Sequence, residues 1–268
     1  MAIISLITDF GLEDEYVGLM KAVILGIDPL ARLVDISHAV EPQDVVHAAF
    51  LLESAGRYFP PGSIHVAVVD PGVGTTRALL CLEANGHRFL APDNGVLSLV
   101  MDAFRPASLR RLENATLWRS NVSATFHGRD ILAPAAAHLS RGVLVRDLGP
   151  ELDPADVVRL AELRAKRSPD GNIAGRIVHI DRFGNLVTNI DAVILQSSGG
   201  FAHERPATIR LAGQAIIGIR RTYADAEPGR PVALIGSRGY LEIAVCCGSA
   251  RSYFNVRRGD AVAVRPGG

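Results

Sequence analysis

Two hydrophobic patterns divide this sequence of 268 residues, and they constrain its fold more than any other feature. As far as about Leu163, short apolar runs alternate with segments whose apolar residues recur at the spacing of amphipathic helices. After a polar, turn-rich stretch, 164–171, only short strand-like runs remain. We therefore predict a layered α/β domain with a mostly parallel sheet over residues 1–163, a linker, and an antiparallel β-barrel over residues 172–268.

Individual elements follow from the same patterns. In the first domain a hairpin turn is expected at Asn85-Gly86, and helices are expected after Tyr16, Pro42 and Gly95. Asp130 is expected to cap a further helix that ends near Ser140. The predicted strands are 3–8, 33–36, 64–69, 78–84 and 87–91 in the first domain, and 173–180, 186–190, 207–211, 215–219, 232–235, 240–245 and 261–264 in the second, where Gly199-Gly200 is one of the turns.

Composition excludes several classes of protein. Lys plus Arg and Asp plus Glu number 28 each, so nothing in the balance forces a basic face and nucleic acid is not an expected partner. Three cysteines do not make a disulfide framework, which suits a reducing compartment. The first residues lack the basic region of a signal peptide, and no apolar run is long enough to span a bilayer. We expect a cytoplasmic protein with no membrane partner.

A Pro- and Gly-rich loop, Asp70-Pro71-Gly72-Val73-Gly74-Thr75-Thr76-Arg77, follows the apolar run 64–69. Ligands of α/β sheets bind beyond the carboxyl ends of strands, so Asp70 stands where chemistry is usually placed. The loop lacks the Lys-Ser/Thr ending of a P-loop and the full dinucleotide fingerprint. Two interpretations stay open: a ligand-binding loop, or a surface turn in which Asp70 and Arg77 pair with each other.

Other polar groups lie at the ends of predicted elements. Asp9 leaves the first strand, and His127 precedes a helix, where a side chain can point into a cleft. A lone histidine is more often structural, and Arg129-Asp130 is equally well an ion pair that supports the turn. In the second domain, 181–185 and 237–240 are loops at strand ends, and 181–185 is also typical of a tight turn.

Taken in order, these motifs resemble one family, the S-adenosylmethionine hydroxide adenosyltransferases, which are related to fluorinating and chlorinating enzymes that use the same substrate. The resemblance covers essentially the whole chain. It rests on Thr8-Asp9-Phe10-Gly11, Asp70-Pro71-Gly72-Val73-Gly74 with Arg77, Asp93-Asn94-Gly95, Phe126-His127-Gly128-Arg129-Asp130, Phe183-Gly184-Asn185 with Thr188-Asn189, and Ser237-Arg238-Gly239-Tyr240.

The resemblance implies roles for individual residues. Asp70, Arg77 and His127 match a catalytic triad around the nucleophilic water, and in halogenating relatives the position of Asp70 carries a tyrosine. The implied substrate-binding residues are Asp9 for the ribose hydroxyls, Phe126 beside the reacting carbon, Asp181, Ser237 and Arg238 for the methionine end, and Phe183, Asn185, Tyr223 and Cys247 on the adenine side. The pair Cys246-Cys247 departs from the Asn-Ala-like pair usual in the family.

The expected reaction is hydrolysis of S-adenosylmethionine to adenosine and methionine by attack of water on the ribose 5′ carbon. The resemblance further implies a homotrimer with sites between subunits. The substrate is a sulfonium with a neutral thioether leaving group, and an arginine beside the one histidine would repel a metal ion. We therefore expect no cofactor and no metal. Two alternatives stay open: a halogenating enzyme, which needs a pocket for a desolvated anion, and a non-catalytic sensor of S-adenosylmethionine or adenosine.

Overall fold

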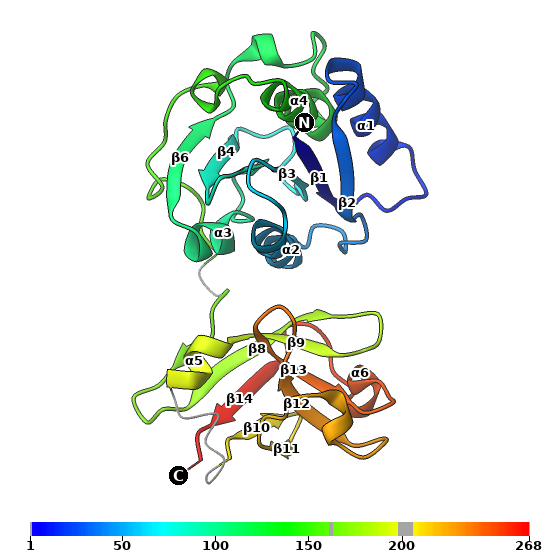
Figure 1. Cartoon of the computed structure of the whole chain (residues 1–268), viewed down its shortest axis with the longest axis vertical. Helices are drawn as coiled ribbons and strands as arrows, with labels where there is room; N and C mark the ends of the chain where they lie inside the picture. Colours follow the sequence, from blue (N-terminus) through cyan, green and yellow to red (C-terminus); the bar gives the residue numbers. More distant parts are fainter. Residues whose placement is uncertain (1, 161–162, 198–205, 268) are drawn as a thin grey trace. The chain divides into compact units, whose positions relative to one another are not determined.

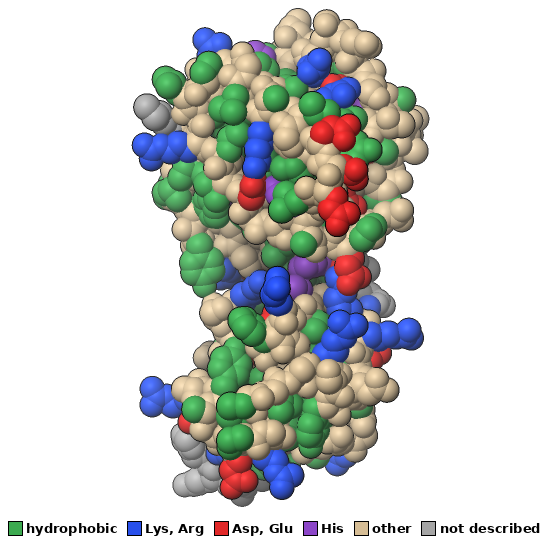
Figure 2. Space-filling view, turned by 90° about the vertical axis from the view of Figure 1, so that its right-hand side faces the viewer, with side chains coloured by type: hydrophobic (Ala, Val, Ile, Leu, Met, Phe, Trp, Pro, Cys, Tyr) green, Lys and Arg blue, Asp and Glu red, His purple; other side chains and the backbone are tan. Residues whose placement is uncertain are grey.

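The computed structural model describes residues 2–160, 163–197 and 206–267 (Figure 1). The chain divides into two compact units, Met1–Leu160 and Ala161–Gly268. The turn predicted at Gly199-Gly200 lies outside the described residues. No helix within the described ranges has both the length and the apolar character that a membrane crossing requires. Both acidic and basic side chains lie on the face of the first unit that Figure 2 shows, where several acidic ones are grouped on the right.

The first unit is built on a mixed sheet of six strands with the order β2-β1-β3-β5-β4-β6. The neighbours β2, β1, β3 and β5 run parallel, whereas β4 and β6 are antiparallel at one edge. Thr8 of β1 pairs with Val68 of β3, so the chain leaves both strands at the same edge of the sheet. The bounds are β1 (Ile3–Thr8), β2 (Arg32–Ser37), β3 (Ile64–Val68), β4 (Leu79–Ala84), β5 (His87–Pro92) and β6 (Pro106–Arg111).

Helices cover both faces of this sheet (Figure 1). On one face α1 (Tyr16–Ile27) packs against α4 (Ala133–Ser140), and on the other α2 (Val45–Tyr58) packs against α3 (Ser98–Ala103). Short helical turns are η1 (Ala115–Leu117), the π-helical turn η2 (Gly128–Leu132), which leads directly into α4, and η3 (Val145–Leu148). The predicted layered α/β fold is therefore confirmed, and β6 is an additional strand that the sequence analysis missed.

Two predicted helix starts were wrong. Asp44, not Pro42, caps α2, because its side chain accepts a hydrogen bond from the backbone N–H of His47 at 3.0 Å. Asp130 does not cap a helix, since its own N–H already donates to the carbonyl of Phe126 at 3.1 Å inside the helical turn. Its carboxylate is fully buried and is neutralised by Arg129, whose Nε lies 2.7 Å away. The ion-pair interpretation of Arg129-Asp130 is confirmed.

The second unit is an all-antiparallel, nearly closed sheet, as predicted. Its order is β11-β10-β14-β8-β9-β13-β12, and β7 adds to β8. Lys166 pairs with Ala174, so part of the expected linker 164–171 belongs to this sheet. The bounds are β7 (Lys166–Arg167), β8 (Ile173–Ile180), β9 (Leu186–Asp191), β10 (Thr208–Leu211), β11 (Gln214–Ile217), β12 (Pro231–Ile235), β13 (Tyr240–Val245) and β14 (Ala261–Arg265), with the short helices α5 (Ala192–Ser197), η4 (Tyr223–Asp225) and α6 (Ala250–Phe254), which were not predicted.

A row of buried, hydrogen-bonded polar side chains lies on the face of the first sheet that α2 and α3 cover. The Ser5 hydroxyl lies 2.7 Å from Nδ1 of His65, and Nε2 of His65 lies 3.1 Å from Nδ1 of His87. The His65 ring also stacks on Phe89, with centroids 4.9 Å apart. Burial lowers the pKa of His65 from 6.5 to about 3, with a smaller contribution from the neighbouring His87. His65 is therefore neutral in the folded protein under ordinary conditions.

This burial makes the first unit sensitive to acid. The unfolded chain binds a proton at His65 below about pH 6.5, whereas the folded state excludes it until about pH 3. The contribution of neutral His65 to the free energy of unfolding is therefore fully present above pH 6.5. It decreases as the pH falls, and the loss from this residue is about 2 kcal/mol at pH 5. Urea titrations followed by the fluorescence of Trp118, the single tryptophan, measure the first unit. We expect a shallower pH dependence in His65→Gln and an unchanged one in His179→Gln, which alters the second unit. Equal slopes in wild type and His65→Gln would contradict the assignment.

Candidate active site

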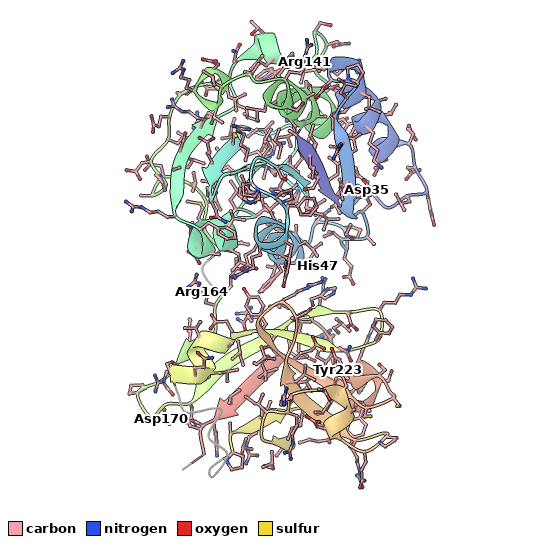
Figure 3. The ribbon with its side chains drawn as sticks, viewed as in Figure 1. Asp35, His47, Arg141, Arg164, Asp170 and Tyr223 are labelled. Atoms are coloured by element: carbon pink, nitrogen blue, oxygen red, sulfur yellow. The ribbon has the colours of Figure 1, made fainter. Side chains whose placement is uncertain are left out.

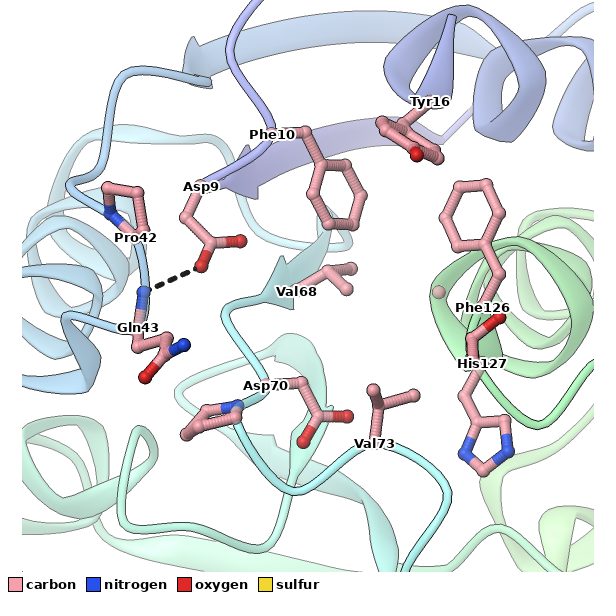
Figure 4. A pocket seen from close by; sticks show the side chains of 13 residues that line it. Asp9, Phe10, Tyr16, Pro42, Gln43, Val68, Asp70, Val73, Phe126 and His127 are labelled. Atoms are coloured by element: carbon pink, nitrogen blue, oxygen red, sulfur yellow. Dashed lines mark hydrogen bonds between the residues drawn. The ribbon is translucent and has the colours of Figure 1, made fainter. Parts of the chain in front are cut away.

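The first unit contains a cavity of about 430 Å³ at the edge where β1 and β3 end (Figure 4). This is where ligands of α/β sheets are usually held. Its walls come from the chain after β1, the approach to α2, the loop after β3 and the turn before α4. The lining residues are Asp9, Phe10, Tyr16, Pro42, Gln43, Val68, Asp70, Pro71, Val73, Thr125, Phe126, His127 and Gly128.

Asp70 and Arg77 form a bidentate ion pair at this cavity. Arg77 Nε donates to Oδ1 and Oδ2 of Asp70 at 2.6 and 2.8 Å, and Arg77 Nη2 donates to Oδ2 as well. Both side chains are more than 90% buried, which strengthens the attraction relative to a surface pair. The two residues therefore do pair, as the alternative interpretation held. The pair lies in the wall of a cavity, however, and not on an open surface.

His127 extends this pair. Its Nδ1 lies 3.0 Å from Arg77 Nη2, and because a guanidinium only donates, Nδ1 must be the acceptor. In the neutral ring the proton is then on Nε2. The pKa of His127 is lowered by burial first and by the Arg77 charge second, against the opposing influence of Asp70 and Asp130. The imidazole is thus neutral at pH 7.

Two close backbone approaches bring the loops of this cluster together. Gly74 has φ +80°, and a Cβ built on it would lie 2.6 Å from the carbonyl oxygen of Ala124. A Cβ on Gly128 would lie 2.8 Å from Cγ1 of Val68. Both distances are shorter than a side chain tolerates, so glycine is needed where the loop after β3 meets the backbone of Ala124 and where the turn after His127 meets the Val68 side chain of β3.

Asp9 faces the same cavity from the end of β1. Its Oδ2 accepts a hydrogen bond from the backbone N–H of Gln43 at 2.8 Å, while the other carboxylate oxygen points into the cavity (Figure 4). Gln43 has φ +67°, a conformation that directs its N–H toward Asp9. The carboxylate is therefore fixed at one oxygen and open to a ligand at the other.

A chain of polar side chains that the sequence analysis missed supports the residues next to Asp9, and it runs from the buried Thr8 and His38 to Asp35, whose side chain is 38% exposed. The Thr8 hydroxyl lies 2.8 Å from Nδ1 of His38, whose Nε2 lies 3.0 Å from Oδ1 of Asp35 on β2 (Figure 3). Lys21 Nζ donates to the same carboxylate at 2.6 Å. Burial raises the pKa of Asp35, but the hydrogen bonds from Lys21 and His38 outweigh it and the net pKa is lowered. The only sequence signal is that polar residues interrupt an apolar strand and its neighbour.

Three aromatic rings form one wall of the cavity. The centroids of Phe10, Tyr16 and Phe126 are 5.4 to 5.6 Å apart in tilted and edge-to-face contacts. The guanidinium carbon of Arg129 lies 5.0 Å from the Phe126 centroid on this wall. Phe126 was expected here, whereas Phe10 and Tyr16 were assigned only to a motif and to a helix face.

The other expected site residues belong to the second unit, and Asp181 has a structural role there. Its Oδ1 accepts from the N–H groups of Phe183 and Asn185 at 2.9 and 2.8 Å, and its Oδ2 accepts from Nδ2 of Asn185 at 2.9 Å. Gly184 has φ +86°. The tight-turn interpretation of 181–185 is therefore confirmed. The same turn leaves Phe183 78% exposed.

A second cluster of polar side chains lies around the start of β13. Tyr223, seen in Figure 3, donates its hydroxyl to Oε1 of Glu242 at 2.5 Å. Burial raises the pKa of Tyr223 to about 12, with further contributions from Glu242 and Asp181. Burial likewise raises the pKa of Glu242. Nη1 of Arg238 is buried without a hydrogen-bond partner among the described residues. Glu242 was missed, although it is the single charged residue of the apolar run 240–245.

Two more expected residues of the second unit, Ser237 and Cys247, are exposed. The cavity of the first unit thus brings together Asp9, Asp70, Phe126 and His127, and Arg77 joins them through its contacts with Asp70 and His127. Within the described part of the chain, no three His, Cys, Asp or Glu side chains are grouped so that they could hold a metal ion.

Comparison with known families identifies the chain. The profile of the SAM hydroxide adenosyltransferase N-terminal domain matches residues 4–149, and that of the C-terminal domain matches residues 175–263. The chain belongs to this family. The residues of the cavity and of its Asp70–Arg77–His127 cluster lie within the part of the chain that the N-terminal family profile matches.

Individual relatives agree with this assignment. The chain is 39% identical to the (R)-S-adenosyl-L-methionine hydrolase of Thermus thermophilus, over 96% of each chain. A fluorinase of Actinopolyspora mzabensis is 27% identical, over 98% of this chain and 96% of that one. A crystal structure of an uncharacterized conserved protein from Thermotoga maritima superposes with a TM-score of 0.90 at 35% identity, over 97% of this chain and 99% of that one. The chain is thus more similar in sequence to the named hydrolase than to the fluorinase.

The interactions of His127 with Arg77 and Asp70 predict the direction in which its pKa shifts when either partner is replaced. Arg77→Met removes a charge that opposes protonation of His127 and leaves the Asp70 carboxylate, so the pKa of His127 should rise. Asp70→Asn removes the charge that favours protonation, so the pKa should fall. NMR titration of the His127 ring resonances in both variants measures this. Shifts of the same direction, or none, would show that the three groups do not interact as described.

Proposed function

We propose that this protein hydrolyses S-adenosylmethionine to adenosine and L-methionine, with water attacking the ribose 5′ carbon in line with the departing thioether. One observation carries the proposal: a buried carboxylate–guanidinium–imidazole cluster shares a cavity with a second carboxylate, Asp9, that is open on one side. Membership of the family and the name of the Thermus thermophilus relative support it.

Substrate recognition is divided between the two domains in this proposal. Asp9 accepts hydrogen bonds from the ribose hydroxyls, and its fixed Oδ2 and open oxygen suit a ligand with two neighbouring donors. Asp181, Ser237 and Arg238 hold the methionine end, and the buried Nη1 of Arg238 is a donor that a carboxylate would satisfy. Phe183, Asn185, Tyr223 and Cys247 lie on the adenine side.

The aromatic wall has a role in the same scheme. Phe10, Tyr16 and Phe126 keep bulk water away from the reacting carbon and present ring faces to the sulfonium. A cation within about 6 Å of an aromatic ring is attracted by roughly 0.5–2 kcal/mol. The attraction holds the charged sulfur close to the wall, which leaves the side of Asp70 and His127 for the nucleophile.

Water is oriented by the triad. The lone pair of His127 Nδ1 is occupied by Arg77, so His127 offers a donor, Nε2–H, to the water oxygen. Asp70 keeps lone pairs that its contact with Arg77 leaves open, and it accepts a hydrogen of the water. As the C–O bond forms, the proton passes to Asp70, and Arg77 stabilises the developing hydroxide character. A positioned group of this kind contributes about 10²–10⁴-fold.

No metal or cofactor has a task in this reaction. The sulfonium already activates the 5′ carbon and leaves as a neutral thioether, and no electrons are transferred. We therefore infer a hydrolase that needs only its substrate and water, working in a reducing, cytoplasmic compartment, which suits the three free thiols.

The same cavity argues against a halide as nucleophile. Asp70 stands at the cavity wall, and a halide about 4 Å from a carboxylate is repelled by about 4 kcal/mol at the dielectric typical of protein sites. Arg77 cancels part of this repulsion but is already bidentate to Asp70. A sensor without catalysis would have no use for the triad. Both alternatives are outcomes of the first test below.

We also propose a homotrimer in which each site joins the first domain of one subunit to the second domain of its neighbour. This arrangement comes from the resemblance of the chain to the family. It agrees with the division of the site residues, since the ribose carboxylate and triad occupy one unit and the expected methionine and adenine contacts the other.

The reaction is tested with purified protein in ¹⁸O-labelled water. We expect methionine and adenosine labelled at the 5′ hydroxyl alone, with unchanged turnover after treatment with a metal chelator. Asp70→Asn should lower turnover at least about 10²-fold while substrate affinity changes far less. Thr76→Ala, an exposed position in the same loop, is the matched control and should stay within about twofold.

Mass spectrometry in the presence of chloride separates the alternatives. A 5′-chlorinated nucleoside would indicate the halogenating enzyme, and binding without any product would indicate the sensor. Unlabelled adenosine, or an Asp70→Asn variant with normal turnover, would refute the proposed role of the triad.

The assembly is tested by mixing two inactive variants. Asp70→Ala damages the first domain and Arg238→Ala the second, so a junction between subunits of the two kinds can contain two intact halves. In randomly mixed cyclic trimers one junction in three is intact whenever both kinds are present, so co-expression should restore about a quarter of wild-type activity. Each variant alone stays inactive. Absence of recovery in mixed trimers, with trimer mass verified by light scattering, would place each site within one subunit.

A further inference from the structure

The adjacent cysteines Cys246 and Cys247 direct both sulfur atoms to the same side of a tight turn after β13. Their Sγ atoms are 3.9 Å apart. Cys247 has φ +56°, a backbone conformation that few residues other than glycine adopt. The backbone of Cys246 is tied on both sides, because its N–H donates to Arg230 O at 3.0 Å and its carbonyl accepts from Gly229 N at 2.8 Å. The sulfur pair is therefore held by the main chain.

The distance between the two sulfur atoms distinguishes disulfide formation from chelation of a metal ion. A disulfide requires about 2.05 Å between the sulfurs, so this turn would have to rearrange. Two thiolates on a tetrahedral ion with bonds of about 2.3 Å lie about 3.8 Å apart. The observed 3.9 Å fits the second case without any movement of the backbone. Chelation of an ion is thus favoured over oxidation to a disulfide.

The site is open on its outer side. Cys247 is exposed, whereas Cys246 is buried with 9% of its surface accessible, so an ion from solution meets the Cys247 sulfur first and the Cys246 sulfur 3.9 Å behind it. No further His, Cys, Asp or Glu among the described residues completes a set of three ligands. Two thiolates and water then form the coordination shell, and soft thiolate donors favour ions such as Zn²⁺ or Cd²⁺. Binding releases the two thiol protons.

The cysteine turn is coupled to the turn at 181–185. Arg251 N, four residues after Cys247, donates to Gly184 O at 2.9 Å. The Gly184 backbone also packs against Ser249, leaving no space for a Cβ. Asp181 and Asn185 belong to this second turn, and both were assigned to substrate binding above. An ion on the two sulfurs, with its bound water, therefore adds a bulky, hydrated group beside a substrate-binding segment, although the complex of a divalent ion with two thiolates is neutral overall.

We propose that Cys246 and Cys247 form an open two-thiolate site for one soft divalent ion of the Zn²⁺ or Cd²⁺ class, and that its occupancy weakens binding of S-adenosylmethionine. The second half rests on the proposed function, whereas the ion site itself does not.

The ion site is tested on the full-length protein with Cd²⁺ alone. We expect one Cd²⁺ per chain by calorimetry, with the ultraviolet charge-transfer band of a cadmium–thiolate bond. Cys247→Ser, at an exposed position that should not disturb folding, should lose both signals, and Cys246→Ser should do the same. Cys81→Ser, at a buried position in the first unit, should keep them. Equal binding by Cys247→Ser and wild type would overturn the site.

The coupling is tested by titrating S-adenosylmethionine with and without one equivalent of Cd²⁺. Affinity in the wild type should fall at least about tenfold on Cd²⁺ binding, while the ratio in Cys247→Ser should stay near one. An unchanged affinity in Cd²⁺-loaded wild type would overturn the coupling. A protein that binds Cd²⁺ at the two sulfurs but does not hydrolyse S-adenosylmethionine would contradict the proposed function and leave the ion site standing.

Discussion

The bidentate contact between Asp70 and Arg77 is the interaction on which the candidate site depends. A buried carboxylate alone would be costly, and so would a buried guanidinium, but together they satisfy each other. Because Arg77 also donates to His127, it sets the tautomer of the imidazole, and its charge adds to the effect of burial in lowering the His127 pKa, whereas Asp70 acts in the opposite direction. The positions of Asp70 and Arg77 and the tautomer of His127 thus depend on this one ion pair.

Sheet topology determines which groups share the cavity with this cluster. Since β1 and β3 are parallel neighbours in register, the residues that follow them leave the sheet side by side, which places Asp9 near Asp70. The polar chain from Thr8 through His38 to Asp35 supports the end of β1. Gly74 allows a close contact with the backbone of Ala124, and Gly128 allows one with the side chain of Val68, and these contacts bring His127 to the cavity. The pairing of the strands at this edge of the sheet therefore determines which residues line the cavity.

In the second unit, hydrogen bonds to neighbouring residues fix the side chains that we expect to bind the substrate. Asp181 closes the turn at 181–185 with its carboxylate, and it keeps lone pairs for a ligand. Glu242 fixes the Tyr223 hydroxyl at 2.5 Å, a role that is hidden in the sequence within an apolar strand. The contacts of Asp181 are local to its turn, whereas the contact of Tyr223 with Glu242 joins a short helix to strand β13.

The sequence by itself determined the class of both units, the strand ends that carry Asp9 and Asp70, and the family, because period-two and period-3.6 patterns and local motifs are written along the chain. The buried partners of these residues were decided only by the tertiary structure. The sequence predicted Asp130 as a helix cap. In the structure its N–H donates to the carbonyl of Phe126 and its carboxylate accepts from Arg129. Neither the His65 chain nor the contact of Arg77 with His127 has a local signal, since each joins residues 22 to 60 positions apart that meet through strand pairing and loop packing.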